Sequence, residues 1–158
     1  MIRIGFGFDT HKLEEGQLFR LGGVDIQHSK GATGHSDADV LIHAICDALL
    51  GAAGLRDIGY HFPDTSAEFK GIDSRELLTR ICVMLREKNF SISNVDSTVV
   101  LQSPKISDHI PEMISQLSAA MQIMEGQVSV KAKTSEKLGF IGREEGASAY
   151  AICLIRND

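Results

Sequence analysis

The sequence has 158 residues, of which 43% are hydrophobic and 23% charged, with a formal net charge of −5. This length and composition predict a single domain, residues 1–158, and exclude a fibre or a disordered chain. The acidic charge argues against nucleic-acid binding, and no apolar run approaches the roughly 20 residues of a membrane span. Because the N-terminus shows no signal segment and the three cysteines are widely spaced, we expect a cytoplasmic protein.

The first predicted element is a strand in "MIRIGFGFDTHKL", where apolar residues alternate with small or charged ones from Ile2 to Phe8. This period is typical of a half-buried strand. Because alternate side chains share a face, Asp9 and His11 leave the strand on the same side. A carboxylate and an imidazole at this spacing can hold a metal ion. They also fit an ordinary polar strand end, which is the simpler interpretation of "GFDTH" alone.

Further along, "GQLFRLGGVDI" predicts a second strand interrupted at Gly22 and Gly23. The strongest helix signal follows in "SDADVLIHAICDALLGAAG", with Ser36 as the expected N-cap and Gly51 or Gly54 at its end. Two acidic residues then fall in its first turn, as the helix dipole prefers. Its predicted apolar face consists of Val40, Leu41, Ala44, Ile45, Ala48 and Leu49.

Residues 55–74 lack clear periodicity, which indicates a lid or binding loop. A second helix is expected after a cap at Asp73 or Ser74, then a strand in "NVDSTVVLQ" and a third helix over residues 107–123 with Pro111 in its first turn. "GQVSVKAKT" predicts a strand with Val128, Val130 and Ala132 facing inward. The last strand, "GASAYAICLI", is apolar enough to be central or at a subunit contact.

This order of elements predicts an α+β fold: a mixed sheet with helices packed on one face, in a ferredoxin-like arrangement. The uncovered face of the sheet must meet another surface. In a domain of this size, a symmetric oligomer is the simplest solution.

His43 lies inside the first predicted helix, with Asp39 and Asp47 one turn away on either side. Taken singly, it is most simply a partly buried core residue, although either carboxylate can accept the second ring N–H of a metal-bound imidazole. Together with Asp9 and His11 it forms a catalytic zinc set of two histidines and a carboxylate, which leaves a fourth coordination position open. The cysteines are not spaced for a closed structural zinc site.

Other polar clusters stand at the predicted ends of elements. His35 and Ser36 precede a helix, where free N–H groups favour an anion. Lys105 follows one strand, and "KTSEK" (residues 133–137) ends another. Capping and turn formation explain such clusters equally well. No P-loop and no GxGxxG motif is present, so a standard nucleotide-binding fold is not indicated.

Several longer stretches, in this order, resemble the 2-C-methyl-D-erythritol 2,4-cyclodiphosphate synthase family. They are "GFDTH", "GHSDADVLIHAICDALLGAAGLRDIG", "HFPDT", "FKGIDSRELL", "NVDSTVVLQSPKI", "HIPEM" and "VSVKAKTSEKLGFIGREEGASA". The resemblance spans about residues 2–155. It implies a homotrimer of α+β subunits with an active site in each cleft between neighbours.

The resemblance also implies roles for individual positions. It assigns Asp9, His11 and His43 to one Zn²⁺ per subunit, and Glu136 to Mg²⁺ or Mn²⁺ on the diphosphate. His35 and Thr134 match the catalytic positions that orient and polarise the phosphates. The other matching substrate positions are Thr10, Ser36, Asp57, Ile58, Gly59, Phe62, Pro63, Asp64, Thr65 and Ser66, with Phe140 and Arg143 near the threefold axis. The matching nucleotide positions are Leu101, Gln102, Ser103, Pro104, Lys105, Ile106, Ser107, Lys133 and Ser135.

Five positions depart from the commonest family pattern: Phe6, Ala38, Ser66, Lys133 and Tyr150. None is an implied metal ligand. The change at Ser66 bears on contacts between the lid and the substrate, and the added cation at Lys133 on affinity for the nucleotide. Tyr150 replaces a residue that is often acidic, which leaves open whether an isoprenoid diphosphate binds in the axial channel of the trimer.

The implied reaction converts 4-diphosphocytidyl-2-C-methyl-D-erythritol 2-phosphate into 2-C-methyl-D-erythritol 2,4-cyclodiphosphate and CMP, in the non-mevalonate isoprenoid pathway. Because the nucleophile belongs to the substrate, no activated serine or cysteine is needed. Two alternatives stay open at this point. One is a zinc-dependent phosphohydrolase that uses the same three residues to activate water. The other is an oligomeric binding protein for nucleotides or isoprenoid diphosphates.

Overall fold

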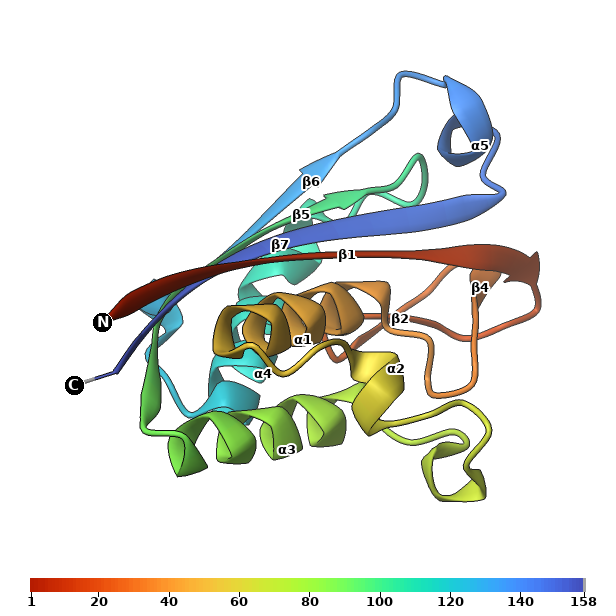
Figure 1. Cartoon of the computed structure of the whole chain (residues 1–158). Helices are drawn as coiled ribbons and strands as arrows, with labels where there is room; N and C mark the ends of the chain where they lie inside the picture. Colours follow the sequence, from red (N-terminus) through yellow and green to blue (C-terminus); the bar gives the residue numbers. More distant parts are fainter. Residues whose placement is uncertain (158) are drawn as a thin grey trace.

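The structure is a computed structural model that describes residues 1–157 of the chain. A five-stranded sheet lies on one side and the long helices pack against one of its faces (Figure 1). The predicted α+β class, with a mixed sheet and helices on one face, is confirmed. The helices are α1 (Val40–Ala53), α2 (Ile58–His61), α3 (Ser74–Glu87), α4 (Ile110–Met121) and α5 (Gly139–Gly142). The strands are β1 (Ile2–Glu15), β2 (Phe19–Leu21), β3 (Val24–Ile26), β4 (Lys30–Thr33), β5 (Phe90–Val100), β6 (Val128–Lys133) and β7 (Gly146–Asn157).

The strand order is β4-β1-β7-β5-β6, and β5 and β6 are its parallel pair. The ferredoxin-like expectation was wrong, because that arrangement alternates as β–α–β–β–α–β. Here α4 connects β5 to β6, which makes those strands parallel, and β6 then leads back through α5 into β7. The predicted central position of β7 is confirmed, since β7 pairs with β1 on one side and β5 on the other.

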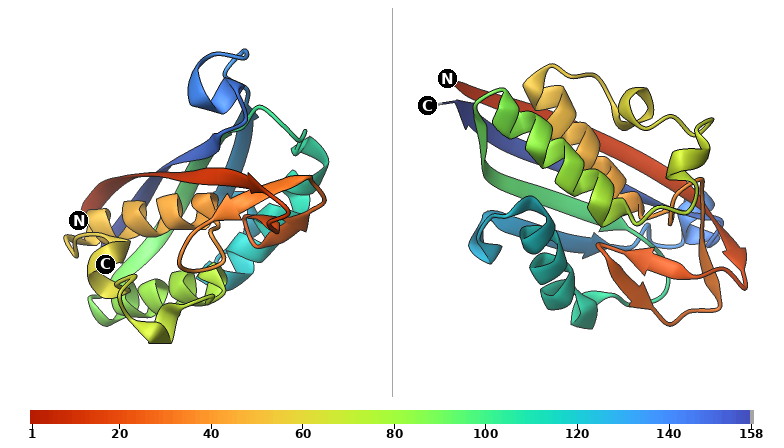
Figure 2. Two further views of the ribbon diagram at one scale, coloured as in Figure 1. Left: turned by 90° about the vertical axis from the view of Figure 1, so that its right-hand side faces the viewer. Right: turned by 90° about the horizontal axis from the view of Figure 1, so that it is seen from below.

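Helix α1 lies directly against β1, sandwiched between the sheet and α3 (Figures 1 and 2). Two glycines of β1 allow this close approach. A Cβ atom built on Gly5 would come within 1.8 Å of the carbonyl oxygen of Ala48, and one on Gly7 within 1.9 Å of that of Ala44. Because no side chain separates the two backbones, residues of α1 reach those at the end of β1.

The apolar residues of β1 point away from the helices. Ile2, Ile4 and Phe6 are 69%, 71% and 62% exposed, whereas Gly5 and Gly7 are buried. The strand is thus half-buried as predicted, but its buried face is the glycine face. The apolar sheet face, as we call the exposed set, consists of Ile2, Ile4, Phe6, Phe8, Tyr150 and Ile152.

Several predicted boundaries are confirmed. Gly22 and Gly23 form the turn of the β2–β3 hairpin, Asp73 caps α3, and Gly54 ends α1 with a left-handed backbone. Ala132, expected to face inward, is exposed near the end of the edge strand β6. Strand β4 was not predicted from the sequence. Residues 55–74 include α2 and a 3₁₀ turn, Ala67–Phe69.

The N-cap of α1 is Asp39 and not Ser36. The carboxylate of Asp39 accepts a hydrogen bond from the backbone N–H of Ile42, and the helix begins at Val40. Ala38 has a positive φ of 58°, so the chain turns once more before it enters the helix. The predicted acidic first turn is therefore absent. Within residues 1–157, no helix is both long and apolar enough to cross a membrane.

Candidate metal centre

Three side chains from two elements converge at one end of the β1–α1 contact. Asp9 and His11 come from β1, and His43 comes from the first half of α1. Oδ2 of Asp9 lies 3.0 Å from Nδ1 of His11 and 3.1 Å from Nδ1 of His43. One ligand atom from each residue lies within 4.8 Å of the other two. The predicted convergence of Asp9, His11 and His43 is confirmed.

The donors of this cluster fit a cation. Nδ1 of His11 is buried and, among the described residues, has no hydrogen bond of good geometry, although Oδ2 of Asp9 lies 3.0 Å away. A buried ring nitrogen without a partner is costly unless something else binds it. Two imidazole nitrogens and one carboxylate oxygen are the ligand set of open, catalytic zinc sites. The residues present can thus hold a divalent metal ion.

The electrostatics of the cluster favour the same conclusion. Burial raises the pKa of the Asp9 carboxyl, but the contacts with His11 and His43 outweigh burial and hold this pKa below its usual range. Burial lowers the pKa of His43, but the hydrogen bond to Asp9 and the negative charges of Asp9, Asp39 and Asp37 together outweigh burial and raise this pKa above its ordinary value. Asp9 is therefore a carboxylate, and protons compete with a metal ion for the ring nitrogen of His43 that faces it.

The far side of the His43 ring is held by two serines. Its Nε2 lies 3.0 Å from Oγ of Ser36 and 2.9 Å from Oγ of Ser74. Ser74 is the first residue of α3 and is fully buried. From the sequence, Ser74 was expected only as a possible helix cap, because no local pattern links a residue at this position to a histidine 31 residues away.

The expected partners of His43, Asp39 and Asp47, serve other groups. Asp39 is fully buried, and its carboxylate accepts three backbone hydrogen bonds. Asp47 accepts one, from the N–H of Ile58 at the start of α2. This part of the prediction was wrong, because backbone N–H groups at nearby turns have no other acceptor and engage these carboxylates first. The donors to Asp39 are Gly22, Gly23 and Ile42.

A cavity of about 330 Å³ opens beside the cluster. His11 and His43 form part of its wall, and loop residues 55–74 supply the opposite part. The rings of Phe62 and Phe69 pack edge to face at 5.3 Å, which makes that wall apolar. Among the predicted site residues, the structure brings His35, Ser36, Ile58, Gly59, Phe62 and Asp64 to this cavity. Lining residues that the sequence analysis did not find are Phe69, Ile72 and Leu77.

The loop is tied to the cavity by His35, whose Nε2 lies 3.1 Å from the carbonyl oxygen of Ser66. Asp57 accepts the N–H of Tyr60 and caps α2, so its carboxylate has a structural partner. The predicted loop positions Pro63 and Thr65 do not line the cavity.

A second cavity, of about 150 Å³, lies where the parallel strands β5 and β6 end. The carboxyl ends of parallel strands are the usual place for ligands in such sheets. The predicted nucleotide residues that line it are Leu101, Gln102, Pro104, Lys105, Ile106, Ser107 and Lys133, with Thr134 beside them. Ser103 and Ser135 are not in the lining. We call this the nucleotide cavity after the role predicted for its residues, which stays a prediction, and the cavity beside Asp9, His11 and His43 the metal cavity. The two share no lining residue.

The other predicted residues supply no side chain to the three-residue cluster, although the backbone N–H of Thr10 donates to Oδ1 of Asp9 at 2.8 Å. Glu136 is exposed and accepts a hydrogen bond from Thr134 at 2.9 Å. Phe140 belongs to α5, which projects beyond the ends of β6 and β7 in Figure 1, and Arg143 follows it. Thr10 points to the opposite side of β1 from Asp9 and His11. Its Oγ1 lies 2.7 Å from Oγ of Ser148.

Fold and site together define a class: a small α+β protein with a histidine–carboxylate cluster that can hold a cation, beside a cavity. Sequence comparison narrows the class further, because the profile of the YgbB family matches residues 2–156. The chain belongs to the YgbB family.

Relatives of known name cover almost the whole chain. It is 56% identical, over 97% of its length and 94% of the relative, to a protein from Porphyromonas gingivalis named 2-C-methyl-D-erythritol 2,4-cyclodiphosphate synthase. A protein of the same name from Phocaeicola vulgatus is 58% identical, over 98% of this chain and 96% of the relative.

Solved structures show the same fold. The structure of IspF from Plasmodium falciparum in complex with CDP is 39% identical, with a TM-score of 0.87 over 99% of this chain and 97% of that one. The bifunctional IspDF from Campylobacter jejuni is 42% identical, with a TM-score of 0.96 over the full chain. This chain spans only 43% of the bifunctional protein.

Proposed function

We propose that this protein cyclises 4-diphosphocytidyl-2-C-methyl-D-erythritol 2-phosphate to 2-C-methyl-D-erythritol 2,4-cyclodiphosphate and releases CMP. The observation that carries the proposal is the convergence of Asp9, His11 and His43 beside a cavity lined in part by loop residues 55–74. The names of the relatives support the same reaction. The 2-phosphate oxygen attacks the β-phosphorus of the diphosphate, and the bond from that phosphorus to the bridging oxygen of CMP breaks.

Asp9, His11 and His43 would hold one zinc ion, whose donor set they match. When bound, such an ion supplies Lewis-acid polarisation of a phosphate oxygen. Glu136 is proposed to contribute to a second site for Mg²⁺ or Mn²⁺ on the diphosphate. This makes the protein a metal-dependent lyase.

The chain's own residues solve a positioning problem, because two anionic phosphates must meet. The apolar wall of Phe62 and Phe69 limits water around the reacting phosphorus, so that the internal oxygen is the nucleophile. His35 and Thr134 are proposed to orient the phosphates. Lys105 and Lys133 place positive charge at the nucleotide cavity, which offsets the charge of the departing CMP.

The substrate carries both a sugar diphosphate and a cytidine, so it needs the metal cavity and the nucleotide cavity together. The two cavities share no residue within one chain. We therefore propose a homotrimer in which the nucleotide cavity of one subunit faces the metal cavity of its neighbour. The apolar sheet face would be buried at the threefold axis. Binding of an isoprenoid diphosphate there, near Phe140, Arg143 and Tyr150, stays a prediction, as does a cytoplasmic location.

The test is turnover of the named substrate in water enriched in ¹⁸O, followed by phosphorus NMR and mass spectrometry. A cyclase gives CMP and the cyclic diphosphate in equal amounts, with no solvent oxygen in either product. A phosphohydrolase incorporates one ¹⁸O atom per turnover and forms no ring. A binding protein leaves the substrate unchanged. Either of the last two results contradicts the proposal.

A further inference from the structure

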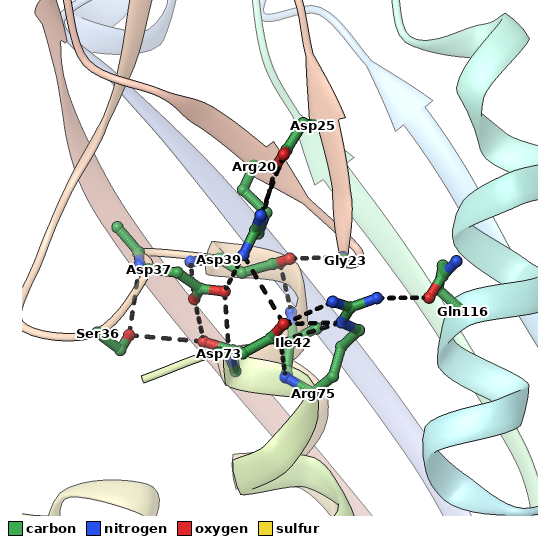
Figure 3. A network of polar contacts seen from close by, with 12 residues as sticks. Arg20, Gly23, Asp25, Ser36, Asp37, Asp39, Ile42, Asp73, Arg75 and Gln116 are labelled. Atoms are coloured by element: carbon green, nitrogen blue, oxygen red, sulfur yellow. Dashed lines mark hydrogen bonds and ion pairs between the residues drawn. The ribbon is translucent and has the colours of Figure 1, made fainter. Parts of the chain in front are cut away.

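A network of charged and polar side chains surrounds Asp37, at the start of α1 and α3 (Figure 3). The side chain of Asp37, which is 8% exposed, occupies its middle and lies 3.4 Å from Nη1 of Arg20. Arg20 also pairs with Asp25 at the β2–β3 hairpin, at 2.6 Å. Arg75 pairs with Asp73 at the start of α3, which extends the network to that helix. Asp37 thus lies between the β2–β3 hairpin and the start of α3.

Asp37 holds Ser74 through two hydrogen bonds. The backbone N–H of Ser74 donates to Oδ2 of Asp37 at 3.1 Å, and the hydroxyl of Ser74 donates to Oδ1 in a short contact. An ionised carboxylate only accepts hydrogen bonds, and a hydroxyl has a single hydrogen to donate. The hydrogen of Ser74 is thus committed to Asp37, and the oxygen of Ser74 is left as an acceptor.

Two other polar groups lie near that oxygen: Nε2 of His43 at 2.9 Å and, farther away, the hydroxyl oxygen of Ser36 at 3.5 Å. Because Ser74 can only accept there, Nε2 of His43 must carry the proton. The other nitrogen, Nδ1, faces Asp9 and His11, so the lone pair that it presents once its own proton is released points at the proposed metal site. A hydrogen bond of this kind to the outer nitrogen of a metal-binding histidine fixes its orientation and raises its basicity.

We propose that Ser74, oriented by Asp37, is the positioning residue that presents Nδ1 of His43 to the metal. The inference rests on the metal role proposed above and extends it to residues that do not touch the ion. Ser36 also lies 3.0 Å from Nε2 of His43, but its hydroxyl contacts no carboxylate and so does not dictate which partner donates. Ser74 and Asp37 therefore set the direction of the hydrogen-bond chain.

The experiment measures the zinc dissociation constant of the full-length protein by competition with a chromophoric chelator. Ser74→Ala should weaken zinc binding by about 10- to 100-fold, the usual effect of losing such a partner. Asp37→Asn keeps the shape but lets an amide donate to Ser74, and it should weaken binding in the same direction. Ser118→Ala is the matched control, because Ser118 is a buried helix serine that bonds only the carbonyl oxygen of Ser115 among the described residues. Its zinc affinity should be unchanged.

A second readout separates positioning from general destabilisation. In the zinc-loaded protein labelled with ¹⁵N-histidine, the Nε2–H signal of His43 should exchange slowly with water. It should exchange faster in Ser74→Ala and return to slow exchange in Ser74→Thr, which restores the hydroxyl. If Ser74→Ala does not fold, Asp37→Asn decides by the same two measurements. Unchanged zinc affinity and exchange rate in a folded variant would overturn the proposal.

The outcome does not depend on the proposed reaction. A wild-type protein that binds zinc in a Ser74-dependent way but releases no CMP would uphold the positioning role and contradict the cyclase. If the wild type and Ser74→Ala release CMP equally well at limiting zinc, the cyclase is upheld and the positioning role of Ser74 is contradicted.

Discussion

Individual residues in this protein are held by a few strong contacts, and Asp39 is the clearest case. Its buried carboxylate accepts the N–H groups of Gly22, Gly23 and Ile42, which joins the β2–β3 turn to the start of α1. Asp39→Asn places an amide donor against at least one of these N–H groups. We expect it to lower the free energy of unfolding by about 1–3 kcal/mol, measured by urea denaturation. Asp25→Asn, on the exposed side of the hairpin, should cost less; equal losses would show that the buried cap has no special role.

The cysteines are also defined by their surroundings at the residue scale. Cys46, Cys82 and Cys153 are buried free thiols. Burial raises the pKa of Cys82 to about 12 and that of Cys153 to about 11, and it raises the pKa of Cys46 as well. The thiolate is the reactive form, so it is nearly absent at pH 8.

We therefore expect no labelling of the native protein by iodoacetamide at pH 8 over an hour. The urea-unfolded protein should incorporate three labels per chain, counted by mass spectrometry. Rapid modification of the native protein would show that at least one thiol is accessible and ionised.

At the scale of elements, the contact between β1 and α1 brings His43 to Asp9 and His11. A methyl group at Gly7 would overlap the carbonyl of Ala44, one residue after His43. Gly7→Ala should therefore push α1 from the sheet, lower the free energy of unfolding by about 1–3 kcal/mol and weaken zinc binding.

Gly51→Ala is the matched control for Gly7→Ala. Gly51 lies within α1, and nothing stands within 4 Å of a Cβ built on it. This substitution should raise the free energy of unfolding by about 0.5–1 kcal/mol, because alanine is the better helix former. A Gly7→Ala protein as stable as the wild type, with normal zinc affinity, would mean that the close approach does not position the site.

The parts of the site that depend on local patterns could be predicted from the sequence, whereas contacts between distant segments could not. The shared face of Asp9 and His11 follows from strand geometry alone, and the composition of α1 placed His43 on a helix. That the two elements meet at Asp9 depends on Gly5 and Gly7, whose role appears only with the packing. The alternation in β1 defined two faces without telling which one the helices cover.

Other features were beyond sequence reasoning for local reasons. The left-handed turn at Ala38 moved the cap of α1 from Ser36 to Asp39, and alanine gives no signal of such a conformation. The contact of Ser74 with His43 joins residues 31 positions apart and needed coordinates. The ferredoxin-like prediction failed because α4 lies between β5 and β6 and makes these neighbouring strands parallel, an order of elements that the β–α–β–β–α–β arrangement does not have.

At the scale of the whole molecule, the apolar sheet face argues for an oligomer. Apolar patches of this kind are rare on monomeric proteins and mark interaction surfaces. Phe6→Glu should convert the proposed trimer to monomers, measured by sedimentation velocity. Val83→Glu, at a 42% exposed position on α3, should leave the trimer intact. A trimeric Phe6→Glu protein would place the subunit contact elsewhere.

The metal content of the purified protein, paired with release of CMP from the substrate, tests the central claim most directly. The account predicts one zinc ion per wild-type chain, and neither zinc nor CMP release in a folded His43→Ala protein. Full CMP release by zinc-free His43→Ala would contradict it.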